Sequence, residues 1–276
     1  MIAPDLIFDV GFHRGEDSEF YLKKGFRVVA IEADPELAGA ARIRFQQYIA
    51  DGRLHLIEGA VAEGCGSTAF FKSDKSVWGT VQPEWALRNS MLGAHSQTIF
   101  VPIIEISSVF RQFGIPHYAK LDIEGNEYIV LDALKSSREK PQFISIESDK
   151  RSYRKLVMEL RTLQLLGYTR FKIVQQSAME GTIVHVSDRA GQLFSYSFGK
   201  GASGRFGNDL SGRWLTFHQA KLRYLLIFAL YRLFGDYGPL RGTLFHRALC
   251  RILHRNIPGW YDTHAALDPG TLGRHP

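Results

Sequence analysis

Cysteine is scarce in this sequence of 276 residues: Cys65 and Cys250 are its only two, and they lie far apart. They match neither a disulfide framework nor the ligand spacing of a zinc site, which favours a reducing, cytoplasmic location. The N-terminus lacks a basic segment followed by an apolar one, because Asp5 and Asp9 interrupt the only candidate. No signal peptide is therefore expected. The longest apolar stretch near the end, residues 224–234, contains an arginine and is too short to span a bilayer.

Acidic residues are scarce in the last part of the chain. Residues 1–200 contain 24 Lys and Arg against 24 Asp and Glu, whereas residues 201–276 contain 10 against 4. The formal net charge of +6 therefore comes entirely from the C-terminal segment. Such a segment suits an anionic partner, such as a phosphorylated substrate, a membrane surface or a nucleic acid. A solvated basic helical face is the simpler interpretation.

The C-terminal segment has no recognised nucleic-acid-binding module, so no nucleic-acid partner is expected. A weak contact of residues 223–234 with a membrane surface is one alternative, and packing on the catalytic domain or on a partner subunit is the favoured one. The polar and aromatic run at residues 259–265 is a candidate cap over a substrate cleft. The sequence leaves the oligomeric state open.

Strand-like and helix-like runs alternate from the start of the chain. The first five are a strand, a helix, a strand, a helix and a strand, at residues 5–10, 16–25, 27–33, 34–49 and 53–61. This order predicts an α/β fold with a doubly wound, mostly parallel sheet. A hairpin-like insertion follows at 66–85, and a strand at 169–176 is expected at the sheet edge. We expect a domain over residues 1–176 and a basic, partly helical extension over residues 177–276.

A turn with two glycines follows the first strand, in the sequence FDVGFHRGED. Ligands bind at the carboxyl edge of doubly wound sheets, and Gly11 lets a ligand approach the backbone there while Gly15 lets the next helix pack closely. A dinucleotide-binding turn would have another glycine where this chain has His13. The turn therefore suits a ligand without a pyrophosphate, or is purely structural.

Glu32 ends the second strand, about twenty residues after the glycine turn. An acid at this place can accept hydrogen bonds from both hydroxyls of a ribose. Together with the glycine turn it points to an adenosine-type ligand. The alternative is an acid at a solvated strand end.

The sequence KLDIEGNE, which begins at Lys120, has three acids at the end of an apolar strand. Clustered carboxylates raise one another's pKa, which makes Asp122 and Glu124 candidates for a general base, while Lys120 offsets part of the repulsion. Oxygen ligands of this kind also permit a metal ion, but nothing demands one, and no metal site is predicted. Glu127 is expected to favour the dipole of the following helix.

These motifs together resemble the FkbM family of S-adenosylmethionine-dependent methyltransferases. The family pattern has a D-V-G-x-x-x-G turn, an acid after the second strand and a D-x-E-G-x-E block before a helix, and all three occur here in order. The resemblance covers residues 5–150 and continues toward residue 175. It implies a class I, Rossmann-like methyltransferase fold with S-adenosylmethionine as cofactor. It also implies O-methyl transfer to a hydroxyl of a sugar, a glycan or a small natural product.

Carried over residue by residue, the resemblance implies a cofactor site made of Asp9, Gly11, His13, Gly15, Glu32, Ala60, Val61 and Asp122. In this set Glu32 holds the ribose, Ala60 and Val61 lie near the adenine, and His13 presents its backbone N–H to the methionine carboxylate. Many family members have Ala-Asn where this chain has Phe12 and His13.

The catalytic candidates are Asp122, Glu124 and His13, of which Asp122 is favoured as the base or as the group that orients the acceptor. One alternative function is that of an oxidoreductase using NAD, which the missing glycine disfavours. The other is a non-catalytic binding or scaffold protein on the same fold.

Overall fold

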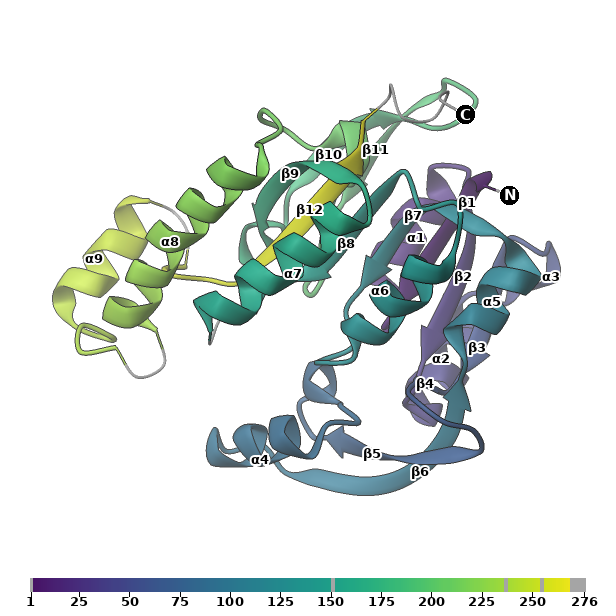
Figure 1. Cartoon of the computed structure of the whole chain (residues 1–276), viewed down its shortest axis with the longest axis horizontal. Helices are drawn as coiled ribbons and strands as arrows, with labels where there is room; N and C mark the ends of the chain where they lie inside the picture. The colour runs from purple at the N-terminus through teal and green to yellow at the C-terminus, as the bar shows by residue number, and fades with distance from the viewer. Residues whose placement is uncertain (1, 150–151, 236–237, 254–255, 269–276) are drawn as a thin grey trace. The chain divides into compact units, whose positions relative to one another are not determined.

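The structure, a computed structural model, describes residues 2–149, 152–235, 238–253 and 256–268 (Figure 1). It divides into two compact units, the first of residues 1–144 and 185–196 and the second of residues 145–184 and 197–276. The division cuts β8 (Phe143–Glu147), β10 (Ile183–Ser187) and β11 (Leu193–Ser197). Each unit is described separately below.

The first unit contains four parallel strands joined by helices. The strands are β1 (Ile2–Val10), β2 (Arg27–Glu32), β3 (Leu54–Glu58) and β7 (Ile115–Leu121). The helices are α1 (Glu16–Lys23), α2 (Pro35–Arg44), α3 (Gln46–Ala50), α5 (Ile106–Phe113) and α6 (Glu127–Ser136). β1 lies between β2 and β7, and β2 also pairs with β3, all in parallel. The predicted alternation of strands and helices is confirmed.

The register of these strands brings their carboxyl ends to the same level. Val10, the last residue of β1, pairs with Ile31 of β2 and with Leu121 of β7. One edge of the sheet therefore holds the glycine turn after β1, Glu32 and Asp122. Ligands of doubly wound folds bind at this edge.

Two predicted elements of this unit are shorter in the structure. Asp34 caps α2 by accepting from the backbone N–H of Glu36 at 2.9 Å, as expected, but the helix ends at Arg44 and α3 follows. The predicted strand at 53–61 is interrupted at Gly59, whose φ is +149°. A Cβ atom added to Gly59 would lie 2.7 Å from the carbonyl oxygen of Pro102. Since a backbone of this kind favours glycine, the strand stops there.

The segment after Gly59 joins a second, three-stranded sheet. Its strands are β4 (Ala60–Val61), β5 (Ser67–Ser73) and β6 (Ser96–Ile104), with β6 in the middle. β5 and β6 are antiparallel, so the partner of β5 lies outside the insertion expected at residues 66–85. Within that range the described residues pair only through an isolated antiparallel bridge between Phe71 and Thr80. The 3-10 helix η1 (Ser76–Trp78) and helix α4 (Pro83–Met91) follow β5. Figure 1 shows β5, β6 and α4 at one end of this unit.

The second unit combines two strands with long helices. Its elements are α7 (Tyr153–Leu165), β9 (Tyr168–Gln175), η2 (Gln176–Ala178), η3 (Gly207–Asp209), α8 (Phe217–Phe234), α9 (Leu244–Ile252) and β12 (Tyr261–Leu267). β12 is buried along its whole length and runs antiparallel to β9. The expectation that residues 259–265 cap a cleft is therefore wrong, because most of this run is a buried strand. Buried residues such as Ala265 and Ala266 suit that position.

Within the first unit the strand order is β3-β2-β1-β7, all parallel, and within the second unit β12 pairs with β9. The mostly parallel α/β fold that the sequence predicts is confirmed, and β9, the strand expected at an edge, stands last in the strand order. The segment after residue 176 contributes β12 and is thus not only helical. The domain boundary at residue 176 stays a prediction. Among the described residues, no helix combines the length and the apolar character needed to cross a membrane.

Candidate functional site

Both glycines of the turn after β1 are required by close contacts. Gly11 has a φ of +93°, and a Cβ added there would lie 1.9 Å from the carbonyl oxygen of Asp122. Gly15 has a φ of +79° and lies against the rings of Phe12 and Phe45. A Cβ added to Gly15 would lie 2.4 Å from the Phe12 ring. The N–H groups of Gly11 and Phe12 both donate to the Ile31 carbonyl at 3.0 Å. The turn is therefore fixed against the ends of both neighbouring strands.

His13 occupies the tip of this turn in a left-handed conformation, with a φ of +53°. Its backbone N–H donates to Oε2 of Glu32 at 2.6 Å. Its ring contacts Glu16, with Nδ1 3.1 Å from Oε1, and Ser76, with Nε2 2.9 Å from Oγ. The N–H expected to face a methionine carboxylate is thus engaged by Glu32. Nothing in the sequence pattern indicated the partner Ser76, which comes from η1.

Glu32 is nearly buried, with 7% of its surface exposed. Its other oxygen, Oε1, accepts from the backbone N–H of Asp34 at 2.8 Å. Burial raises the pKa of Glu32 to about 7, and the two backbone N–H groups oppose this shift only in part. A carboxylate has about four acceptor positions, so two remain for hydroxyl groups of a ligand.

Ala60 and Val61 lie beside the end of β2. The N–H of Gly59 donates to the backbone carbonyl of Glu32 at 2.8 Å. Ala60 is buried in a small apolar cluster with Phe70 and Val101, and Val61 is buried as well. The carbonyl of Val61 accepts from the side-chain amide of Asn126 at 2.8 Å. The segment after β3 is thereby tied to the loop after β7, which the sequence did not reveal.

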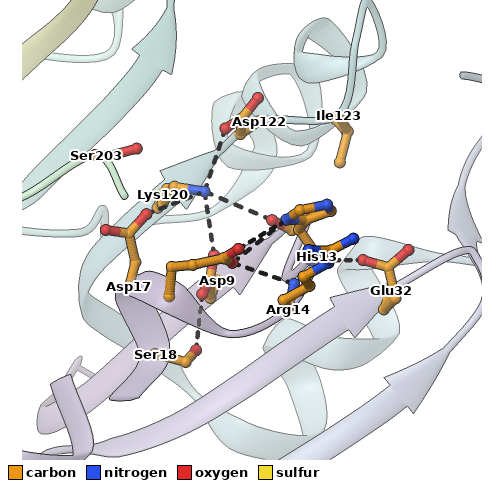
Figure 2. A network of polar contacts seen from close by, with 12 residues as sticks. Asp9, His13, Arg14, Asp17, Ser18, Glu32, Lys120, Asp122, Ile123 and Ser203 are labelled. Carbon is orange, nitrogen blue, oxygen red and sulfur yellow. Dashed lines mark hydrogen bonds and ion pairs between the residues drawn. The ribbon is translucent and has the colours of Figure 1, made fainter. Parts of the chain in front are cut away.

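Lys120 is the centre of a buried network of charges (Figure 2). Its Nζ lies 3.5 Å from Oδ1 of Asp9, 3.6 Å from Oδ2 of Asp17 and 3.3 Å from Oδ2 of Asp122. Lys120 is 5% exposed and Asp9 is 1% exposed. The surrounding carboxylates raise the pKa of Lys120 well above its ordinary value, although burial acts against them. Ser18 also donates to Asp9, at 2.7 Å.

Asp17 belongs to this network although the sequence motifs assign it no role. Its place on α1 is the signal for it, because it stands three and four residues before Phe20 and Tyr21, which are both buried. This helical spacing places Asp17 on the face that packs against the sheet.

The loop after β7 is held by its own acids and by the insertion. Glu127 accepts from the N–H groups of Ile123 at 3.0 Å and Gly125 at 3.1 Å, which orders the loop at the start of α6. Glu124 has a φ of +50°, and its carbonyl accepts from the Thr80 hydroxyl at 2.8 Å. The side chain of Asp122 is 30% exposed and remains accessible.

The parallel sheet with its joining helices and the glycine turn after β1 give the first unit a Rossmann-like α/β fold. The family model of the methyltransferase FkbM domain matches residues 9–173, which is more than half of the chain. The chain therefore belongs to the FkbM methyltransferase family, and S-adenosylmethionine is its cofactor. No curated protein sequence matches it.

Solved structures of methyltransferases are similar at low identity. An FkbM methyltransferase from Methylobacillus flagellatus is 16% identical with a TM-score of 0.42, over 63% of this chain and 40% of that one. A precorrin-6y C5,15-methyltransferase from Geobacter metallireducens is 12% identical with a TM-score of 0.37, over 71% and 77%. An O-methyltransferase from Bacillus cereus, in complex with SAH, is 16% identical with a TM-score of 0.33, over 69% and 71%.

Proposed function

We propose that this methyltransferase acts on a hydroxyl oxygen of a sugar, a glycan or a small natural product. The observation that carries the proposal is the accessible carboxylate of Asp122 at the carboxyl edge of the sheet, directly beside the Gly11 turn. The cofactor supplies a methyl group on a positively charged sulfur. A neutral alcohol must lose its proton as it attacks, so a carboxylate that accepts this proton and orients the oxygen assists the reaction.

The residues present fit the cofactor by the chemistry of their donor set. Glu32 has acceptor positions left for the two ribose hydroxyls, and the apolar, buried residues Ala60 and Val61 follow the end of β3 beside it, where the adenine would lie. Gly11 leaves room for the methionine part to approach the backbone. Asp9 holds the turn in place and does not contact the cofactor in this proposal. Both of its carboxylate oxygens are already engaged, one by Ser18 and the other by Lys120.

Among the catalytic candidates, Asp122 is favoured over His13. Both ring nitrogens of His13 already have partners, in Glu16 and Ser76, and its role is to fix the turn. The oxygen Oδ2 of Asp122 lies near Lys120, which holds the side chain at the edge of the sheet. Glu124 is a second acid of the same loop, which we assign to contact with the acceptor.

The Asp122→Asn variant tests this assignment. We expect turnover to fall by about 10²–10⁴-fold, since the general base is lost, while the cofactor binds with an affinity within about threefold of the wild type. The measurement is S-adenosylhomocysteine formation with a panel of hydroxylated sugars and natural products, alongside calorimetry with the cofactor. Asp132→Asn, at an exposed ion pair of α6, is the control.

Unchanged turnover of Asp122→Asn would remove this residue from the mechanism. Turnover with amine or thiol acceptors, and with none of the hydroxyl compounds, would contradict O-methyl transfer.

The raised pKa of Glu32 is expected to make the stability of the protein depend on pH. Its pKa of about 7 in the folded chain lies above the ordinary value of 4.5, so the folded state retains a proton that the unfolded state has lost. The protonated Glu32 therefore contributes to the free energy of unfolding fully below pH 4.5, and this contribution is lost as the pH rises through about 7. The total loss is about 3 kcal/mol. In Glu32→Gln this part of the pH dependence disappears.

Denaturant unfolding at about pH 5 and about pH 8 measures this difference, with Glu84→Gln as a control at an exposed acid. Because ribose hydroxyls donate best to the ionised carboxylate, the cofactor affinity of the wild type should rise as the pH passes about 7. An affinity that Glu32→Gln leaves unchanged would separate Glu32 from the ribose.

A further inference from the structure

Helix α8 has two apolar faces, and only one of them is buried. The buried face packs within the second unit through Ala220, Tyr224, Ile227 and Phe234. The other face is exposed and includes Leu222, Leu225, Leu226 and Leu233. Leu226, for example, is 64% exposed. Positions 222, 226, 229 and 233 follow one another at spacings of four, three and four, so they form one continuous stripe along the helix.

Helix α9 adds further exposed apolar residues next to α8 (Figure 1). It has no buried residue, and its Leu244, Phe245 and Ile252 are all exposed, Leu244 by 80%. His246 anchors this helix, because its ring stacks on Phe234 at 5.1 Å and its Nε2 lies 2.7 Å from the carbonyl of Ile257. The apolar residues of α9 are therefore held in place on the surface.

All charged residues of these two helices are cations. Neither helix contains Asp or Glu, and the exposed Arg223, Arg232, Arg247 and Arg251 accompany the leucines. Between residues 210 and 261 the sequence has eight Lys and Arg against a single acid. Apolar side chains flanked by arginines, with no acids, are the composition of helices that lie in the interface of an anionic membrane.

We propose that α8 and α9 form a docking surface for anionic lipid bilayers. In this arrangement the exposed leucines enter the boundary between headgroups and acyl chains, while the arginines contact lipid phosphates. A second copy of this chain fits less well, because the symmetric contact of two such surfaces would bring arginines against arginines. A nucleic acid would leave the leucine stripe in contact with phosphates and water. This inference does not depend on the identity of the methyl acceptor.

Sedimentation of the full chain with vesicles tests the proposal. We expect binding to vesicles of phosphatidylcholine mixed with phosphatidylglycerol, and much weaker binding to phosphatidylcholine alone. The double variant Leu222→Gln, Leu226→Gln should bind at least roughly tenfold more weakly, because two apolar side chains no longer enter the interface. Arg223→Gln should lose roughly fivefold, and added salt should reduce that difference.

Leu165→Gln, at a leucine of α7 that is even more exposed than Leu222 and Leu226, is the control and should bind like the wild type. Calorimetry with S-adenosylmethionine shows that each variant remains folded. Three results would overturn the proposal: no binding to anionic vesicles, equal binding to neutral ones, or wild-type binding by the leucine variant. Sedimentation velocity tests whether a second copy of the chain occupies this surface instead. A dimer that dissociates on the leucine substitutions, in a protein that does not bind vesicles, would assign the surface to self-association.

Discussion

Replacing Gly11 with alanine is expected to abolish measurable cofactor binding. The added Cβ would lie 1.9 Å from the carbonyl oxygen of Asp122, which is rigid backbone of the neighbouring strand end. The residue also has a φ of +93°, which costs an alanine roughly 1–2 kcal/mol by itself. The turn and the loop after β7 must therefore separate. Displacements of about 1 Å in such sites reduce function by about a hundredfold or more.

Gly66→Ala is the control for this experiment. Gly66 has a similar φ, +87°, but an added Cβ meets no atom within 4 Å, so only the backbone penalty applies. Calorimetric titration with S-adenosylhomocysteine measures the loss of affinity, and thermal unfolding measures the loss of stability. If Gly11→Ala bound the ligand as tightly as Gly66→Ala does, the close approach of the turn to Asp122 would play no part in cofactor binding.

Replacing Lys120 with methionine is expected to have the largest effect on stability, about 3–5 kcal/mol. Removing a buried cation leaves the carboxylates of Asp9, Asp17 and Asp122 without their shared partner, and the first two are nearly fully buried. Burial raises the pKa of Asp9 even with Lys120 beside it. Without the lysine, ionisation of this group becomes still less favourable.

The sign of the pH dependence distinguishes this effect from a simple loss of packing. The neighbouring carboxylates raise the pKa of Lys120 above its ordinary value of 10.5, so the stability it contributes is present below that value and lost only at higher pH. In Lys120→Met the carboxylates take up protons as the pH falls, and the difference from the wild type should shrink toward about pH 4.

Denaturant unfolding across this pH range measures the difference in the free energy of unfolding. Lys135→Met, at an exposed ion pair with Asp132, should change stability by less than about 1 kcal/mol. A destabilisation of Lys120→Met that stays constant from acid to neutral pH would contradict the charge network as its cause.

Much of the first unit could be predicted from local sequence. Apolar runs such as residues 27–32 become buried parallel strands, and Asp34 with Pro35 marks the start of α2 because capping is a local property. The end of β3 could not be predicted in this way. It depends on Gly59, whose close contact is with the distant strand β6. β12 was missed because it follows two helices and pairs with β9, in which Gln175 is 86 positions before its partner Tyr261 and Tyr168 is 99 positions before Leu267.

The residues of the site could likewise be predicted only in part from the sequence. Gly11, Glu32 and Asp122 could be singled out because Glu32 is the last residue of a strand and the other two directly follow one. The contacts that hold the neighbouring residues come from other elements: Asp17 of α1 contacts Lys120, Ser76 of η1 contacts His13, and Asn126 before α6 donates to the carbonyl of Val61. Their contacts depend on how the elements pack, which spacing along the sequence does not record.

The most direct test of the account is calorimetric titration of the purified full chain with S-adenosylmethionine, S-adenosylhomocysteine and NAD in parallel. We expect micromolar binding of both sulfur ligands and no binding of NAD. We also expect Glu32→Gln to weaken the binding of both sulfur ligands. A well-folded sample that binds neither of them, or that binds NAD instead, would contradict a cofactor site at the Gly11 turn.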